Sequence, residues 1–433
     1  MLNEANTTFI IISTILVFFM TPGLAFFYGG LVSKKNVVNT MLSVFIICGL
    51  AVIIYIAFGY DLSFTGNLFG IVGKLQHPFL SGLDLSKVTL PKQGLDTGTY
   101  LSFQMMFALI TPALFVGAIV GRMRFNYLLA FIVGWSILIY YPLVHMVWSP
   151  KGILANLGVL DFAGGTVVHI NAGITALLLS LFLGKRLKKE TSHYNLPWVL
   201  CGTAILWIGW YGFNAGSALG INGLAVNAFL VTTVAAAFAM LTWMGLDIYL
   251  SGKPSLVGVC TGALCGLVGI TPAAGYVTSV GAVLIGFLCS LVSFVFVTYV
   301  KPKLSFDDPL DAFGCHGVSG IVGSVLTGVF ATKTVNPTIS ENGLCYGGGW
   351  HLLGVQLLGT LVTIGFVSLM CLLLIPTLRL IIRMRVSQEE ELVGLDRSEH
   401  GERADYLVDE QHTIERYPHE FRGQLERLTN KYN

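Results

Sequence analysis

The chain has 433 residues, of which 54% are hydrophobic and only 11% are charged, and its formal net charge is +2. Soluble domains usually carry about a quarter charged residues, so water alone cannot solvate a surface with so few charges. The small net charge also argues against nucleic acid as a partner. Together with a mean hydropathy of +0.75, these values predict a membrane protein.

Apolar stretches of roughly 20 residues, the length that a helix needs to cross a bilayer, recur along the chain. They are too long and too uniformly apolar for the alternating strands of a membrane barrel. We therefore predict an all-α membrane protein with a transmembrane domain over residues 1–385. The eleven expected transmembrane helices lie near 7–32, 37–59, 99–120, 125–147, 162–184, 196–216, 223–249, 255–271, 276–299, 310–331 and 350–384.

Lysines and arginines predict the orientation, because they concentrate in cytoplasmic loops. An outside N-terminus leaves few of them outside, namely Lys74, Lys87, Lys92, Lys151 and Lys333. The connections that would then be cytoplasmic carry Lys34, Lys35, Arg122, Arg124, Lys185, Arg186, Lys188, Lys189, Lys253, Lys301, Lys303, Arg379, Arg383 and Arg385. The same orientation puts the polar segment 386–433 in the cytoplasm, as a tail that either is a disordered extension or binds a partner.

Two stretches repeat an aspartate and a histidine at the same spacing. Asp161 and His169 lie in "DFAGGTVVHINAG", and Asp308 and His316 lie in "DDPLDAFGCHGVSGIVG", so eight positions separate the members of each pair. By the span order, the first stretch enters the membrane from outside and the second from the cytoplasm, as in inverted repeats around a midplane site. Eight helical residues span about 12 Å, so the two rings are expected to meet.

The histidines are functional candidates, because ionisable side chains at membrane depth are costly and usually line a cavity or a relay. The aspartates stand where helices begin, and a carboxylate there binds free backbone N–H groups. We therefore interpret Asp161 and Asp308 as caps rather than as ligand-binding residues.

Other polar and aromatic residues have structural explanations when each is taken alone. Trp148 suits a membrane interface, Phe107 suits core filling, and "LWIGWYGFNAGSALG" suits close helix packing. The eight cysteines show neither a disulfide framework nor a metal-ligand pattern. The residues alone thus predict a transporter or channel with a histidine pair, without a metal or another cofactor.

The motifs resemble those of the ammonium transporter family, the Amt/Mep/Rh group, and most closely its bacterial Amt branch. The resemblance rests on "PGLAFFYGGLV", "DFAGGTVVHINAG", "GWYGFNAGSA", "DDPLDAFGCHGVSGIVG" and "GLDRSEHGERAD", which occur in the family's order. It implies two inverted five-helix repeats, a diagonal eleventh helix, and a homotrimer with one pore per protomer in the plasma membrane. It also implies ammonium, or methylammonium, as substrate.

The resemblance further implies roles for single residues. An outer recruitment site would consist of Phe107, Trp148 and Ser217, while Phe107 and Phe213 would close the pore entrance. His169 and His316 would form the pair in the pore. Structural support is expected from Asp161, Asp308, Trp210 and Thr271.

The chemistry of ammonium agrees with these assignments. Each aromatic ring attracts a cation by about 0.5–2 kcal/mol, whereas moving the intact charge into a dry pore costs of order 20 kcal/mol in the Born limit. Deprotonation avoids this cost, because ammonia crosses as a neutral molecule while the proton either stays outside or follows its own relay. In a histidine pair one ring donates while the other accepts.

Two other functions remain open at this stage. The chain could be a receptor that binds ammonium and signals through its tail, or an Rh-like channel for another small neutral solute. The tail is too short for a catalytic output domain but long enough for a contact surface, and the resemblance implies a PII-type signal protein as a partner at the cytoplasmic face. An enzyme is not expected, because the spans contain no nucleophile–base pair, phosphate loop or metal cluster.

Overall fold

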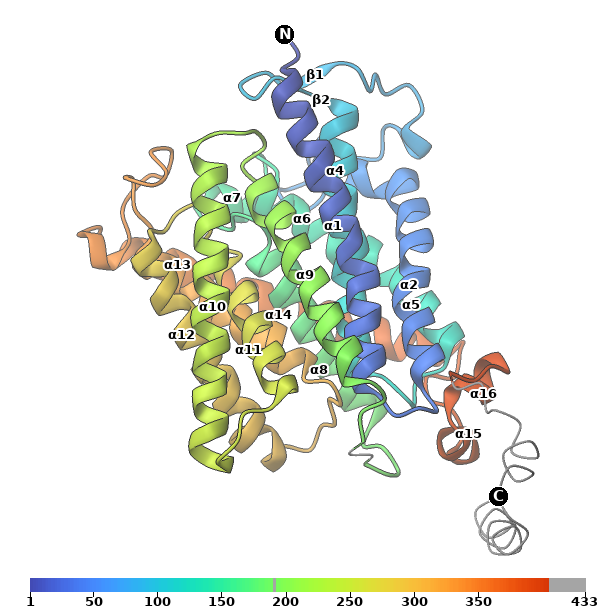
Figure 1. The fold of residues 1–433 in the computed structure, drawn as a ribbon. Coiled ribbons are helices and arrows are strands. Elements are labelled where there is room, and N and C mark those ends of the chain that lie inside the picture. The colour runs from blue at the N-terminus through green and yellow to red at the C-terminus, as the bar shows by residue number, and fades with distance from the viewer. Residues whose placement is uncertain (190–191, 405–433) are drawn as a thin grey trace, which may run out of the picture.

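The computed structural model describes residues 1–189 and 192–404, which form a bundle of long helices (Figure 1). Among these residues, ten helical segments are long and apolar enough to cross a membrane. The first half contains α1 (Glu4–Leu31), α2 (Val37–Ile54), α3 (Tyr60–Phe64), α4 (Thr97–Leu114), α5 (Phe125–Trp135), α6 (Tyr141–Trp148), α7 (Ile153–Asn156) and α8 (Asn171–Leu183). The second half contains α9 (Leu196–Gly216), α10 (Gly223–Ser251), α11 (Leu256–Ile270), α12 (Ser279–Val295), α13 (Ser319–Phe330) and α14 (His351–Arg379).

The predicted span at 255–271 is a short helix. Helix α11 has 15 residues, about 22 Å at 1.5 Å per residue, which is less than the roughly 30 Å of a hydrocarbon core. Pro272 lies two residues after its last residue, and a proline prevents the helix from continuing in its regular hydrogen-bond pattern. Most of α11 is nevertheless buried among its neighbours. The other ten predicted spans correspond to the long apolar segments.

Several long segments contain π-helical turns, which the sequence analysis did not predict. Three of them, η1 (Tyr55–Gly59), η4 (Ser136–Tyr140) and η6 (Phe296–Val300), continue regular helices. The other two, η5 (Gly165–Ile170) and η8 (Phe313–Val318), open the segments that carry the two histidines. Such turns are rare and occur frequently at functional sites.

Small residues allow the central helices to pack closely. A β-carbon on Gly202 of α9 would collide with the backbone of Phe27 in α1, and one on Gly286 of α12 would collide with Ala235 of α10. Close backbone approach of this kind is typical of helix packing in lipid. Helix α14 crosses behind the bundle (Figure 1), where it packs against α13 on one side and against α8 and α5 on the other.

The two ends of the bundle differ. One end, here called the N-terminal face, carries the N-terminus and a small antiparallel hairpin of β1 (Val88–Leu90) and β2 (Leu95–Asp96). The hairpin was not predicted, and it binds the N-terminus through a hydrogen bond from the Asn3 N–H to the Gly94 carbonyl. The opposite end, here called the tail face, carries α15 (Gln388–Val393) and α16 (Leu395–His400).

The described part of the tail is folded against the bundle. Ser387 and Glu390 form a capping box at the start of α15. The Asp396 carboxylate accepts the backbone N–H of Asn39 at 2.8 Å, and the Leu395 N–H donates to the Asn36 side chain at 2.9 Å. Disorder is therefore the wrong description of residues 386–404, and the rest of the predicted tail, 405–433, lies outside the described residues.

Candidate functional site

The two repeat histidines meet in the middle of the bundle. The ring centroids of His169 and His316 lie 5.4 Å apart and the ring planes differ by 12°. Both side chains are buried, with 1% and 4% exposure. Within the described chain, neither ring nitrogen of His169 has a hydrogen-bond partner, and Nδ1 of His316 has none either. Because buried polar atoms are normally hydrogen-bonded, these nitrogens call for a functional explanation.

A row of aromatic rings connects this pair to the N-terminal face. Trp148 contacts Phe107 edge-on at 5.5 Å between centroids, and Phe107 lies 4.5 Å from Phe213. Phe213 in turn lies 5.9 Å from His169. Trp148 is partly exposed, whereas the two phenylalanines are buried. We call Trp148, Phe107, Phe213, His169 and His316 the ring row.

Trp210 and Thr271 support the ring row from the side. The Trp210 ring lies 5.4 Å from the His169 ring, nearly parallel to it. Its indole N–H donates to the Thr271 hydroxyl at 2.9 Å, and that hydroxyl donates to the Leu267 carbonyl. Thr271 therefore fixes the rotation of Trp210, which in turn forms a flat wall for His169.

Ser217 lies one helical turn after Phe213. Its hydroxyl donates to the Phe213 carbonyl at 2.8 Å, which leaves the oxygen lone pairs free to accept a hydrogen bond. The side chain is partly exposed. The structure thus places a hydroxyl acceptor above the buried phenylalanines of the ring row.

Asp161 caps the first histidine-bearing segment. Its carboxylate accepts the backbone N–H groups of the next turn, at 3.0 Å from Gly164, 2.6 Å from Gly165, 3.0 Å from Thr166 and 3.2 Å from Val167. Its carbonyl accepts the indole N–H of Trp148 at 3.0 Å. Asp161 therefore joins the start of η5 to the first member of the ring row.

Asp308 caps the second histidine-bearing segment at the tail face. Its carboxylate accepts the N–H groups of Ala312 at 3.1 Å and Phe313 at 2.8 Å. Asp308 lies at the start of this segment and does not belong to the ring row. Both aspartates thus occupy the capping positions that the sequence predicts.

The two segments touch through glycines. A β-carbon on Gly173 would collide with the backbone of Gly317, the residue after His316. A β-carbon on Gly320 would lie 3.2 Å from Cβ of His169. Only glycine permits this approach, which brings the two imidazoles together.

A narrow cavity lies beside His316, and the preceding residues Leu310, Ala312 and Cys315 form part of its wall. Its volume for a water-sized molecule is about 10 Å³, close to the minimum for one water. Its lining is mainly apolar and consists of Leu24, Phe27, Tyr28, Leu114, Leu206, Trp210, Leu264, Leu310, Ala312, Cys315 and His316. The space beside His316 is thus small and largely apolar.

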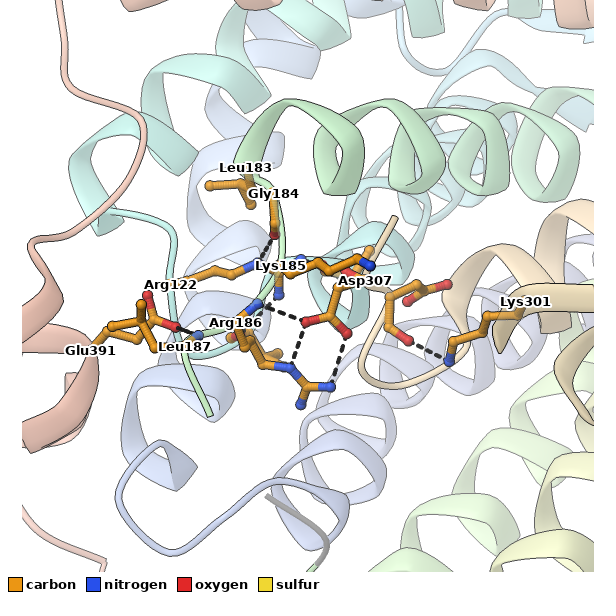
Figure 2. A network of polar contacts seen from close by, with 12 residues as sticks. Arg122, Leu183, Gly184, Lys185, Arg186, Leu187, Lys301, Asp307 and Glu391 are labelled. Carbon is orange, nitrogen blue, oxygen red and sulfur yellow. Dashed lines mark hydrogen bonds and ion pairs between the residues drawn. The ribbon is translucent and has the colours of Figure 1, made fainter. Parts of the chain in front are cut away.

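A network of charged side chains underlies the tail face (Figure 2). The Arg186 guanidinium binds the Asp307 carboxylate at 2.8 and 3.0 Å. Burial would raise the pKa of Asp307, but the hydrogen bonds from Arg186 outweigh it and lower the pKa to about 2. Burial lowers the pKa of Arg122 to about 10. The Asp307 carboxylate and the Arg122 guanidinium therefore stay charged at neutral pH.

Sequence reasoning missed several buried polar residues. Arg122 was counted only as a loop charge, although its side chain is completely buried. His145 also escaped notice. Its ring nitrogens contact the Ser63 carbonyl at 2.9 Å and the Asn67 side chain at 3.1 Å. Nothing in the local pattern distinguishes His145 from a functional histidine, whereas the position of Arg122 between two spans could have suggested a role in connecting them.

The bundle and the ring row define a class of protein: a helical, polytopic membrane protein with a buried histidine pair at the end of a row of aromatic rings. Comparison with known proteins identifies the family. Residues 8–405 match the sequence profile of the Ammonium Transporter Family. The chain belongs to this family.

Individual relatives agree over nearly their whole length. The chain is 44% identical to the ammonium transporter of Aquifex aeolicus, over 93% of this chain and 94% of that protein. It is 41% identical to the ammonium transporter of Bacillus subtilis, over 92% and 98%. Among solved structures, Saccharomyces cerevisiae Mep2 superposes with a TM-score of 0.83 at 32% identity, covering 90% of this chain and 88% of Mep2. A structure titled "Sensor Amt Protein" superposes with a TM-score of 0.83 at 29% identity, covering 92% and 98%.

Proposed function

We propose that this chain transports ammonium by binding the ion at its N-terminal face, removing a proton and conducting ammonia past the histidine pair. Membership of the ammonium transporter family supports the substrate. The observation that carries the mechanism is the close pair of buried imidazoles, in which both nitrogens of His169 and Nδ1 of His316 have no hydrogen-bond partner among the residues that the structure describes. A transport role agrees with the membership of this family.

The proposed binding site lies where the ring row reaches the surface. Trp148 and Phe107 present aromatic faces, and Ser217 presents a hydroxyl oxygen that can accept one of the ion's hydrogen bonds. Ammonium combines a positive charge with four N–H donors, so cation–π attraction and an acceptor oxygen suit it together. Asp161 supports this site indirectly, because its carboxylate accepts four backbone N–H groups and the Thr166 hydroxyl, while its carbonyl accepts the Trp148 indole N–H.

The proposed gate is the contact between Phe107 and Phe213. The two rings lie 4.5 Å apart and close the passage above His169, so they must separate for a molecule to pass. The buried surroundings below them disfavour a charge, because desolvating an ion costs several kcal/mol even after relaxation. Ammonia avoids most of this cost, and the imidazole nitrogens can accept and donate the hydrogen bonds that it loses on leaving water.

The test replaces each histidine of the pair. Purified protein in liposomes would be assayed for ammonium-driven current, methylammonium tracer flux and potassium current. His169→Ala and His316→Ala are expected to abolish discrimination between ammonium and potassium. His145→Gln is the matched control, because His145 is equally buried but has partners for both nitrogens. Unchanged potassium discrimination in both alanine variants would overturn the mechanism.

The same proposal includes the topology and the assembly. It places the N-terminal face outside and the tail face in the cytoplasm of the cell, and it includes α11 as an eleventh span within two inverted five-helix repeats. We also propose a homotrimer with one pore per protomer, which native mass spectrometry would test. Accessibility of single cysteines introduced in the β1–β2 hairpin would test the orientation.

We further propose that the tail face binds a PII-type signal protein. The folded helices α15 and α16 support this, because they present a defined surface next to the loops between the spans. A pull-down that compares the full chain with a chain lacking residues 386–433 would test the interaction. Equal capture by both would contradict a role for the tail.

A further inference from the structure

A single buried arginine connects the two histidine-bearing segments at the tail face. Arg122 lies between α4 and α5, with no exposed side-chain surface. Its guanidinium donates four hydrogen bonds, all to backbone carbonyls. They run from Nε to Gly184 at 3.1 Å, from Nη1 to Val120 at 3.4 Å, and from Nη2 to Ala118 at 3.0 Å and to Asp307. A buried charge held by carbonyls alone is unusual, because buried charges are normally paired.

Two of these carbonyls belong to the segments that carry the histidines. Gly184 directly follows α8, which continues from η5 and His169. Asp307 directly precedes Asp308, which caps η8 and His316. One planar guanidinium therefore joins the end of the first segment to the beginning of the second. Its rigid fork of donors fixes directions as well as distances.

A second connection joins the same two loops. Arg186, two residues after Gly184, binds the Asp307 carboxylate through its backbone N–H at 2.9 Å and through two guanidinium nitrogens. Figure 2 shows Arg122, Arg186 and Asp307 in one network of polar contacts. The Arg122 bond to the Asp307 carbonyl and the Arg186 bonds to its carboxylate leave this residue little freedom to move.

We propose that Arg122 is a positioning residue which, together with Asp307, sets the spacing of His169 and His316 from the tail face. The inference rests on the proposed role of the histidine pair. The glycine contacts bring the two segments together at mid-depth, while Arg122 joins them at the tail face, so the relative position of the two segments is fixed at two levels. Loss of the arginine would let one segment tilt against the other, and a displacement of about 1 Å at a reacting pair can cost as much as 100-fold in rate.

The experiment compares Arg122→Gln and Arg122→Lys with Arg124→Gln as the matched control. Arg124 is the next arginine in the chain, and it forms ion pairs with Glu390 and Glu399, which lie in the tail rather than in a histidine-bearing segment. Each purified variant would be measured in liposomes for the ratio of ammonium to potassium current and for the pH profile of methylammonium flux. A pH profile reports the protonation of the histidines, which a purely structural defect would not shift.

We expect Arg122→Gln to lower the current ratio by about tenfold or more and to shift the pH profile. Arg122→Lys should give a current ratio and a pH profile between those of Arg122→Gln and the parent chain. The lysine side chain keeps the charge, but it lacks the planar fork of donors that reaches both Gly184 and Asp307. Arg124→Gln should match the parent in both measurements. If Arg122→Gln fails to fold, Asp307→Asn provides the second variant, with the same expected shift.

Folded Arg122→Lys and Asp307→Asn proteins with the parent's current ratio and pH profile would overturn the inference. That outcome is distinct from failure of the proposed function. If His169→Ala and His316→Ala lose potassium discrimination while the Arg122 and Asp307 variants keep it, only the positioning role is wrong. If the histidine variants keep discrimination, the pair itself has no such role.

Discussion

The two histidine-bearing segments share one local structure but differ in what anchors it. In each, an aspartate caps the first turn, the residue three positions later has a positive φ, and a π-helical turn carries the histidine. The residues with positive φ are Gly164 at 120° and Asp311 at 55°. In the first segment the anchors are backbone N–H groups and the Trp148 indole. In the second they are charged side chains.

The charged anchors of the second segment come from several elements. Lys301 binds the Asp308 carbonyl at 2.6 Å and also pairs with the Asp311 carboxylate. Arg186 binds Asp307. The two segments thus share the backbone geometry that holds a histidine ring in the middle of the bundle. They differ in the groups that anchor this geometry at each face. The anchors named for the first segment carry no positive charge.

The largest expected difference between the segments concerns their caps. Asp161→Ala removes a carboxylate that accepts four backbone N–H groups, whereas Asp308→Ala removes one that accepts two. We expect losses of roughly 3 and about 1–2 kcal/mol in the free energy of unfolding, respectively. Thermal unfolding in detergent measures both, with the exposed Asp84→Ala as control. A larger loss for Asp308→Ala would refute the comparison.

The next largest effect is the pH dependence of the stability that the Asp307 carboxylate contributes. Because the pKa of Asp307 is lowered from 3.8 to about 2 in the folded state, its carboxylate stabilises the fold by about 2 kcal/mol at any pH above the unfolded value. This contribution disappears as the pH falls from 3.8 through 2. Asp307→Asn should therefore lower the unfolding temperature equally at pH 5 and pH 8. A loss of unfolding temperature that differs between pH 5 and pH 8 would contradict the lowered pKa of Asp307.

A smaller effect is expected at the aromatic anchor of the first segment. Trp148→Leu removes a ring from the proposed binding site, and a cation–π contact of about 0.5–2 kcal/mol corresponds to a rise of up to about 30-fold in the half-saturation concentration for methylammonium. Trp148→Phe keeps a ring but loses the bond to the Asp161 carbonyl, so its rise should be smaller. Uptake kinetics in liposomes measure both, and an unchanged half-saturation in Trp148→Leu would remove Trp148 from the site.

The smallest effect is expected where the tail meets the bundle through partly exposed charges. Arg124 pairs with Glu390 at 2.9 Å, and both side chains are about 30% exposed. Such pairs contribute at most about 1 kcal/mol. Arg124→Gln should therefore change the unfolding temperature by a degree or two, and 0.5 M salt should remove the difference because it screens exposed charges. A loss comparable to that of Asp307→Asn would show that the tail is a principal anchor.

Much of the fold follows from patterns that the sequence displays directly. Long apolar runs predicted ten of the membrane-spanning segments, and the repeated spacing of Asp161–His169 and Asp308–His316 predicted that the two rings meet. The family resemblance added Trp148, Phe107, Phe213 and Ser217 as site residues. The structure brings Trp148, Phe107 and Phe213 into one row with the histidines and places Ser217 one turn beyond Phe213. Their roles remain proposals.

The remainder depends on contacts between distant parts of the chain. The burial of Arg122 cannot be predicted from the neighbouring sequence, because its carbonyl partners at Gly184 and Asp307 lie 62 and 185 positions away. The folding of residues 386–404 likewise depends on Asn36 and Asn39. The π-helical turns escape prediction because the spans are apolar on nearly all sides, so the extra residue of such a turn leaves no break in the apolar pattern.

The contact between Gly173 and Gly317 limits how the space between the two histidine-bearing segments can change by mutation. Where two main chains touch directly, no side chain remains that could be shortened to enlarge the space. A change of residue at either position can only push whole helices apart. At this contact, more room between the two segments therefore requires shifts of entire segments and cannot come from a shorter side chain.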